Sequence, residues 1–340
     1  MRPAALTTGT PAVDGASGSA LTRRAGWIVG TVAVVASALI LRAARGTNFF
    51  FDEWWFITHR RDASFDDFVR PHNGHLVAIP VAIYNALFRT VGLRSYTPYL
   101  LLLVGLHVLT CVLLFVYLRR RAPVLYALLA AVMMLLLGNA WQDLLWAFQI
   151  TYLLSAAAGV GALLLLDRRD RVGDVGAMLA ITASVLSGGL GLVFAGGALV
   201  ELLWTRRDRR RLWIVAVPIA MYLVWYATNG ASDGAFENLT HFDPYTTTLA
   251  GHAARSLLGT SLLVGKLIAL VFLIIVAVQV VRTWPIAGRF ANCIAMLVAY
   301  WLLLTYDRGN DIGGTESRYV YLSVLLMLLV GGEVLRTWQP

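Results

Sequence analysis

Two adjacent carboxylates, Asp52 and Glu53, lie inside an aromatic run that reads Phe-Phe-Phe-Asp-Glu-Trp-Trp-Phe over residues 49–56. Aromatic rings exclude water from a carboxylate and raise its pKa, which suits the carboxylate to take a proton from a substrate hydroxyl. The alternative role is structural, because Asp and Glu also stabilise the start of a helix. We take both residues as candidate catalytic groups.

A second polar cluster, His72-Asn73-Gly74-His75, follows in the same segment. His72, Asn73 and His75 are candidates for substrate binding, since imidazole and amide groups could hold an acceptor or orient the carboxylate of Asp52. Imidazoles and carboxylates also bind divalent cations, so such an ion is an open alternative, although no cofactor is firmly expected. A polar loop that histidines merely cap is the structural alternative.

Two cations next to apolar runs are candidates for binding a phosphate. Arg318, beside Tyr319, carries a planar guanidinium that can bind phosphate through two parallel hydrogen bonds. Lys266 lies inside an apolar run, where a charge is costly and is usually functional, unless the side chain reaches out to the membrane surface. Gln142 and Asp143 could bind sugar in the same cavity, although an interfacial tryptophan belt explains their segment equally well.

The composition assigns the protein class. The chain has 340 residues, of which 59% are hydrophobic and 14% are charged, with a net charge of +9. Soluble domains carry about 25% charged residues. A basic balance could indicate a nucleic-acid-binding protein, but the apolar runs are too long for that class. The sequence predicts an all-α polytopic membrane protein.

The apolar runs predict about ten membrane-spanning helices, because about 20 apolar residues cross the hydrocarbon core. These runs are residues 26–43, 97–118, 123–139, 149–166, 173–187, 189–204, 212–228, 256–281, 288–305 and 318–335. The fifth and sixth are either two crossings or a re-entrant hairpin that turns at Ser187-Gly188-Gly189. Arginines cluster in alternate loops, which places both termini in the cytoplasm, as expected for a plasma-membrane protein.

The chain is expected to contain one domain. Residues 1–22 are predicted to be a disordered cytoplasmic tail, and residues 23–340 a single transmembrane domain. The longest loop, residues 44–96, is expected outside the cytoplasm and carries both Asp52 and the histidine cluster. The short apolar run 76–88 within it is predicted to be an interfacial helix, because it is too short to cross the membrane.

Phe51-Asp52-Glu53-Trp54, directly after the first span, resembles the signature of the GT-C glycosyltransferases. These membrane enzymes use polyprenyl-phosphate-linked sugars and include protein mannosyltransferases and lipid A aminoarabinose transferases. The histidine cluster with its following apolar helix, and Glu316-Ser317-Arg318-Tyr319 at the last span, are similar to further elements of that family. The resemblance implies that Asp52 is the general base and that Arg318 and Tyr319 lie near the donor phosphate. Many members have more spans and a soluble C-terminal domain. This chain departs from that pattern, because about ten spans are predicted.

The expected function is transfer of a hexosyl or pentosyl unit, with inversion, from a polyprenyl-phosphate donor to a glycan, lipid or protein acceptor on the extracytoplasmic face. The alternatives are a polytopic transporter, or a flippase or polymerase of lipid-linked sugars, and a purely structural membrane protein. Transporters concentrate polar groups at the membrane midplane. Here most acidic residues fall in the loops predicted to lie outside, which favours an enzyme.

Overall fold

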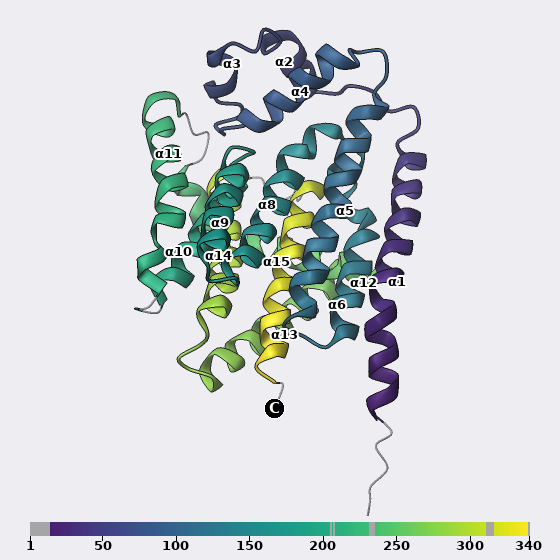
Figure 1. Ribbon diagram of the computed structural model, residues 1–340, viewed down its shortest axis with the longest axis vertical. Coiled ribbons are helices and arrows are strands. Elements are labelled where there is room, and N and C mark those ends of the chain that lie inside the picture. The colour runs from purple at the N-terminus through teal and green to yellow at the C-terminus, as the bar shows by residue number, and fades with distance from the viewer. Residues whose placement is uncertain (1–13, 205, 207, 231–234, 311–315, 339–340) are drawn as a thin grey trace, which may run out of the picture.

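The computed structural model of the protein describes residues 14–204, 206, 208–230, 235–310 and 316–338. Within these ranges every regular element is a helix, and the only β-type contact is an isolated bridge between His72 and His75. The long helices form a bundle, and short helices form a layer across one of its ends, which we call the loop end (Figure 1). The predicted all-α fold with several apolar helices is confirmed.

Six helices are long and apolar enough to cross a membrane among the residues described. They are α1 (Asp14–Ala43, from Leu21), α5 (Thr97–Arg119), η2 with α8 (Ala147–Gln149 and Ile150–Leu166), α13 (Leu262–Arg282), α14 (Gly288–Arg308) and α15 (Ser317–Arg336). A seventh arises if α6 (Val124–Leu135) and the segment Gly138–Leu145 (η1, Gly138–Ala140, and α7, Trp141–Leu145) form one span with a bend of 40°. The count of about ten stays a prediction.

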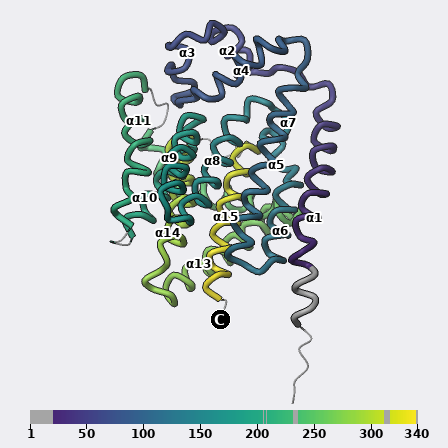
Figure 2. Tube along the Cα trace, in the orientation of Figure 1, coloured from purple at the N-terminus to yellow at the C-terminus, as the bar shows by residue number. Residues whose placement is uncertain are grey.

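The last helix, α15, forms the centre of the bundle. In its apolar window 83% of the residues are buried inside the protein, against 22% for α13 and 28% for α1. The helices α1 and α13 therefore lie at the rim, with apolar faces available to lipid. The first helix begins and the last helix ends at the end of the bundle opposite to the loop end (Figure 2).

Several expected boundaries were wrong. The run 256–281 is not one helix, because α12 (Phe242–Leu258) ends at Gly259, whose φ of 64° lies in the left-handed region. Ser261 then caps the start of α13. The run 123–139 stops at Leu135. Helix α1 begins at Asp14, inside the tail expected at residues 1–22, and residues 1–13 of that tail lie outside the described residues.

The turn expected at Ser187-Gly188-Gly189 joins α9 (Arg171–Val185) to α10 (Leu190–Trp204). Each helix has 15 residues and is therefore about 22 Å long, shorter than the hydrocarbon core of about 30 Å. A Cβ atom on Gly189 would lie 2.8 Å from Nδ1 of His75. Glycine at this position thus lets the turn approach the histidine cluster.

A buried ionic network joins five helices at the end opposite to the loop end. Arg121, directly after α5, lies 2.6 Å from Asp167 and 2.7 Å from Glu333 of α15. Arg289 of α14 lies 3.1 Å from Asp167, at the end of α8, and 2.6 Å from Glu201 of α10. Both arginines are almost fully buried. Because these charges are paired and hydrogen-bonded, the network holds the five helix ends together.

The remaining helices lie toward the other side of the bundle. The helix α11 (Trp213–Asn229) follows the 3-10 turn η3 (Asp208–Arg211) and lies at the side opposite to α1 (Figure 1). The turn η4 (Phe236–His241) packs on α14 and leads into α12. The indole nitrogen of Trp225 in α11 donates to the carbonyl of Val69, which ties this side of the bundle to the layer at the loop end.

Candidate functional site

Three short helices, α2 (Asp52–His59), α3 (Phe65–Val69) and α4 (Ala78–Thr90), form the layer at the loop end (Figure 1). The helix α4 matches the short helix expected at residues 76–88. Ser64 and Asp67 form a capping box at the start of α3. The buried Arg60 donates to the carbonyls of Asp67 at 3.1 Å and Pro71 at 2.9 Å. These bonds fix the chain between α2 and the histidine cluster.

The guanidinium of Arg60 also lies over the ring of Trp55, with 4.6 Å between the guanidinium carbon and the ring centroid. Burial lowers the pKa of Arg60 to about 10, so the side chain remains charged at neutral pH. Part of the aromatic run therefore serves to hold a cation inside the loop. This role explains Trp55 without any contact to a substrate.

Glu53 anchors the layer of short helices and is not among the residues that line the cavity of Asp52. Its carboxylate accepts hydrogen bonds from the hydroxyl of Tyr84 at 2.7 Å and of Tyr96 at 3.0 Å, and from the backbone amide of Phe50 at 2.8 Å. The residue is fully buried. Desolvation raises its pKa from 4.5 to about 7, although the hydrogen bonds lower it in part. Glu53, expected as a catalytic group beside Asp52, is thus held by Tyr84, Tyr96 and the backbone of Phe50, and its catalytic role stays a prediction.

This burial predicts a pH dependence of stability. Glu53 has a pKa of about 7 in the folded protein and 4.5 in the unfolded chain. The folded state therefore binds the proton more tightly, and its protonation stabilises the fold fully below pH 4.5 but no longer above about pH 7. The shift corresponds to about 3 kcal/mol. Thermal unfolding of the detergent-solubilised protein between about pH 5 and pH 8 should show a falling melting temperature that Glu53→Gln flattens. Equal slopes in both proteins would contradict this assignment.

The backbone at Phe51 has an unusual conformation directly before the two carboxylates. Phe51 has a φ of 46°, which a bulky side chain adopts only when the surroundings enforce it. Its neighbours are fixed by the Glu53 contact and by a hydrogen bond of 3.0 Å from the indole nitrogen of Trp54 to the carbonyl of Phe49. Asp52 then begins α2 and faces a cavity between the layer and the bundle.

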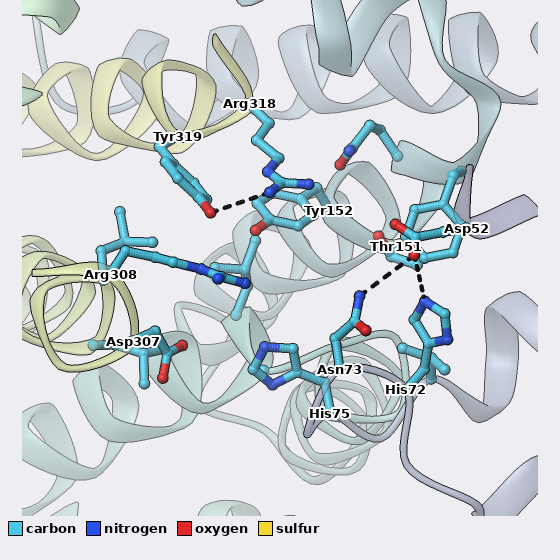
Figure 3. A pocket seen from close by; sticks show the side chains of 18 residues that line it. Asp52, His72, Asn73, His75, Thr151, Tyr152, Asp307, Arg308, Arg318 and Tyr319 are labelled. Atoms are coloured by element: carbon cyan, nitrogen blue, oxygen red, sulfur yellow. Dashed lines mark hydrogen bonds and ion pairs between the residues drawn. The ribbon is translucent and has the colours of Figure 1, made fainter. Parts of the chain in front are cut away.

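The histidine cluster forms a tight turn. His72 and His75 exchange backbone hydrogen bonds of 2.9 Å each, and Asn73 and Gly74 have φ values of 48° and 75°. Asn-Gly is the residue pair that favours such a two-residue turn. The turn directs its side chains at the same cavity as Asp52 (Figure 3).

Asp52 contacts two side chains of this turn. Its Oδ1 atom lies 3.2 Å from Nε2 of His72 and 3.5 Å from Nδ2 of Asn73. The ring of His72 is buried against Trp55 and Phe148, with centroid distances of 5.0 and 5.2 Å. The carboxylate therefore has a fixed orientation, and most of its surroundings exclude water.

Cations line the cavity on the side opposite to Asp52 (Figure 3). Arg318 at the start of α15 lies 2.5 Å from Glu316 and 3.3 Å from the hydroxyl of Tyr319. Arg308 at the end of α14 also lines the cavity, next to Asp307. The structure thus brings two guanidinium groups to one wall, where a phosphate could contact both.

Gln142 and Asp143 lie behind this wall rather than in it. The carboxamide oxygen of Gln142 accepts from the hydroxyl of Ser317 at 3.2 Å and from the backbone amide of Arg318 at 3.1 Å. Asp143 is fully buried and interacts electrostatically with Arg318. Both residues therefore position the start of α15, and neither lines the cavity as a sugar-binding group.

Of the expected site residues, six line the cavity. They are Asp52, His72, Asn73, His75, Arg318 and Tyr319. Lys266, expected as a second phosphate ligand, lies in a separate groove between α12, α13 and α14. The physical reason is that α12 intervenes in the chain and displaces the start of α13 from the cavity. Arg308 occupies the place in the wall that Lys266 was expected to take.

Several residues of the cavity were not predicted from the sequence. The rest of its wall comes from η2, the start of α8, the turn between α9 and α10, and the end of α14. These residues include Gln149, Thr151, Tyr152, Gly188, Gly189, Asp307 and Arg308. The signal for Arg308 was its position just beyond a predicted span, at the same membrane side as Asp52. Counted out to its open mouth, the space between these walls is about 800 Å³, a figure that includes the open entrance.

The side chains that could act as metal ligands do not form a metal centre among the described residues. No group of three or more His, Cys, Asp or Glu side chains is arranged to hold a metal ion in the part of the chain that the structure describes. The cavity instead combines two carboxylates (Asp52 and Asp307), two imidazoles and two guanidinium groups. This arrangement can accept a proton at one wall and hold an anion at another.

No protein-family model, curated protein or solved structure matches this chain.

Proposed function

We propose that the protein is a membrane glycosyltransferase that uses a polyprenyl-phosphate-linked sugar and acts at this cavity. The observation that carries the proposal is the convergence of Asp52, His72, Arg308 and Arg318 on one cavity from segments far apart in the chain. Sugar transfer from a lipid phosphate requires a base for the acceptor and cations for the leaving phosphate. The two walls of the cavity carry these two kinds of group.

In the proposed reaction the acceptor hydroxyl donates its proton to Asp52 while its oxygen attacks the anomeric carbon of the sugar. The bond between the anomeric carbon and the phosphate oxygen breaks, and polyprenyl phosphate leaves with the electron pair. Arg318 and Arg308 hold the phosphate as negative charge develops on it. A single displacement of this kind inverts the configuration at the anomeric carbon. His72 and Asn73 act as positioning residues that orient Asp52.

We further infer that the cavity faces the extracytoplasmic side of the plasma membrane and that both termini are cytoplasmic. The arginine clusters at residues 119–121 and 209–211 support this orientation, because they lie at the end of the bundle opposite to the loop end. The acceptor would enter from outside, and the donor from the outer leaflet.

The test is reconstitution of the full chain in proteoliposomes with a panel of radiolabelled polyprenyl-phosphate sugars and with glycan, lipid and peptide acceptors. Transfer of label to an acceptor, and its loss in Asp52→Asn, is the expected result. Movement of the intact donor between leaflets without a new glycosidic bond would identify a flippase instead. Failure of every donor, with the protein folded, would overturn the proposal.

A further inference from the structure

A groove at the rim of the bundle is lined by a lysine and otherwise mostly by apolar groups. Its walls come from α12, α13 and α14 and share no residue with the cavity of Asp52. They include Leu267, Leu270, Leu273 and Trp301, with Lys266 on the same wall. Counted out to its open mouth, the space is about 690 Å³. The three leucines are 54%, 54% and 40% exposed, so the groove opens to the surroundings of α13.

The surroundings of α13 are apolar. It is the most hydrophobic of the candidate spans, with a mean hydropathy of 2.7, and only 22% of its apolar window is buried inside the protein. An apolar helix at the rim of a membrane protein faces lipid chains. A groove on this face is therefore suited to a lipid chain rather than to water.

A pair of cations lies at the crossing of α12 and α13. The two helices approach closely at Gly251 and Gly265, since a Cβ atom on Gly265 would lie 2.2 Å from the carbonyl oxygen of Gly251. The same Cβ would lie 2.8 Å from Cβ of Arg255, and one on Gly251 would lie 2.6 Å from Cγ of Lys266. The stems of the two cations thus start from one helix crossing.

No acidic side chain neutralises this pair among the residues that the structure describes. Neither Arg255 nor Lys266 forms an ion pair with the described carboxylates, and the neighbouring His252 interacts with both cations. Two like charges held together next to lipid are stabilised by an anion between them. The complementary group in a membrane is the phosphate of a lipid headgroup.

We propose that Arg255 and Lys266 bind the headgroup of an anionic phospholipid whose acyl chain lies in the groove between α12, α13 and α14. The site is separate from the proposed catalytic cavity and does not depend on sugar transfer. It gives a role to the lysine near the start of the apolar helix α13 and to the arginine that lies beside it on α12.

The test is native mass spectrometry of the full chain released from nanodiscs that contain phosphatidylcholine and phosphatidylglycerol in equal amounts. The wild type should retain phosphatidylglycerol, and Arg255→Gln with Lys266→Gln should lower its retention about tenfold, since each basic residue contributes to the attraction. Arg255→Lys with Lys266→Arg keeps the charges and should retain it. Arg282→Gln is the matched control, because Arg282 is an exposed cation at the other end of α13.

Equal retention of the two lipids by the wild type would overturn the proposal, as would unchanged retention in the double glutamine variant. Added polyprenyl phosphate distinguishes the donor from a bilayer lipid. If the double glutamine variant loses polyprenyl phosphate but keeps phosphatidylglycerol, the groove belongs to the donor and the proposal is wrong. Because the readout is bound lipid, its failure is separate from any failure of glycosyltransferase activity.

Discussion

Asp52→Asn is expected to lower sugar transfer by about 10³-fold or more while the melting temperature of the protein changes little. General-base catalysis contributes about 10²–10⁴-fold to a rate. Asparagine keeps the shape of the side chain and its contact with Asn73, but it cannot accept the acceptor proton. The measurement is initial rate of label transfer in proteoliposomes at saturating donor and acceptor.

The matched control is Asp62→Asn, which makes the same change at an exposed carboxylate of the same loop. It should transfer sugar at the wild-type rate. A fully active Asp52→Asn protein would show that another group takes the proton. Because Asp52 is mostly buried beside His72, circular dichroism and melting of the variant should be recorded together with its activity.

Arg318→Gln is expected to lower kcat/KM for the donor by about 10²-fold, because developing charge on the leaving phosphate loses its bidentate partner. Arg318→Lys should recover only part of this loss, since an ammonium cannot form two parallel hydrogen bonds. Arg308→Gln should show a smaller loss, about tenfold, if the two arginines share the phosphate. The measurement is the rate at low donor concentration.

Two further comparisons separate charge binding from folding. Arg94→Gln removes an exposed cation from the loop that carries Asp52 and should leave the rate unchanged. Arg318 also lies beside the buried Asp143, so its removal destabilises the start of α15. Arg318→Lys keeps the charge there and should melt close to the wild type. Equal activity of Arg318→Gln and Arg94→Gln would overturn the assignment of the phosphate wall.

The helical class and most of the long helices could be predicted because long apolar runs in a chain with few charges have one stable arrangement. The break at Gly259 could not be predicted, because the apolar run 256–281 continues through it. The left-handed φ of Gly259 is visible only in the structure. The helix α12 was missed because its polar and apolar residues alternate around it and no long apolar run marks it.

The candidate site could be predicted in part. Asp52 and Arg318 could be predicted as a base and a phosphate-binding cation, because both fall on the same predicted side of the membrane. Glu53 was assigned with Asp52 because the two are adjacent, but successive residues of a helix point about 100° apart, so both cannot face one cavity. Whether Lys266 or Arg308 lines the cavity depends on the path of α12 between two spans. The order of the apolar runs does not give that path.

The ionic network around Arg121 and Arg289 bears on the transporter alternative. Alternating access would require the five helix ends that it joins to separate, so that a substrate could leave on that side. Breaking one buried pair leaves an uncompensated charge and costs about 3–5 kcal/mol, and four short contacts connect these helices. A gate at this end of the bundle would have to break these contacts in order to open. The proposed sugar transfer does not require this end of the bundle to open, because both reactants would reach the cavity at the loop end.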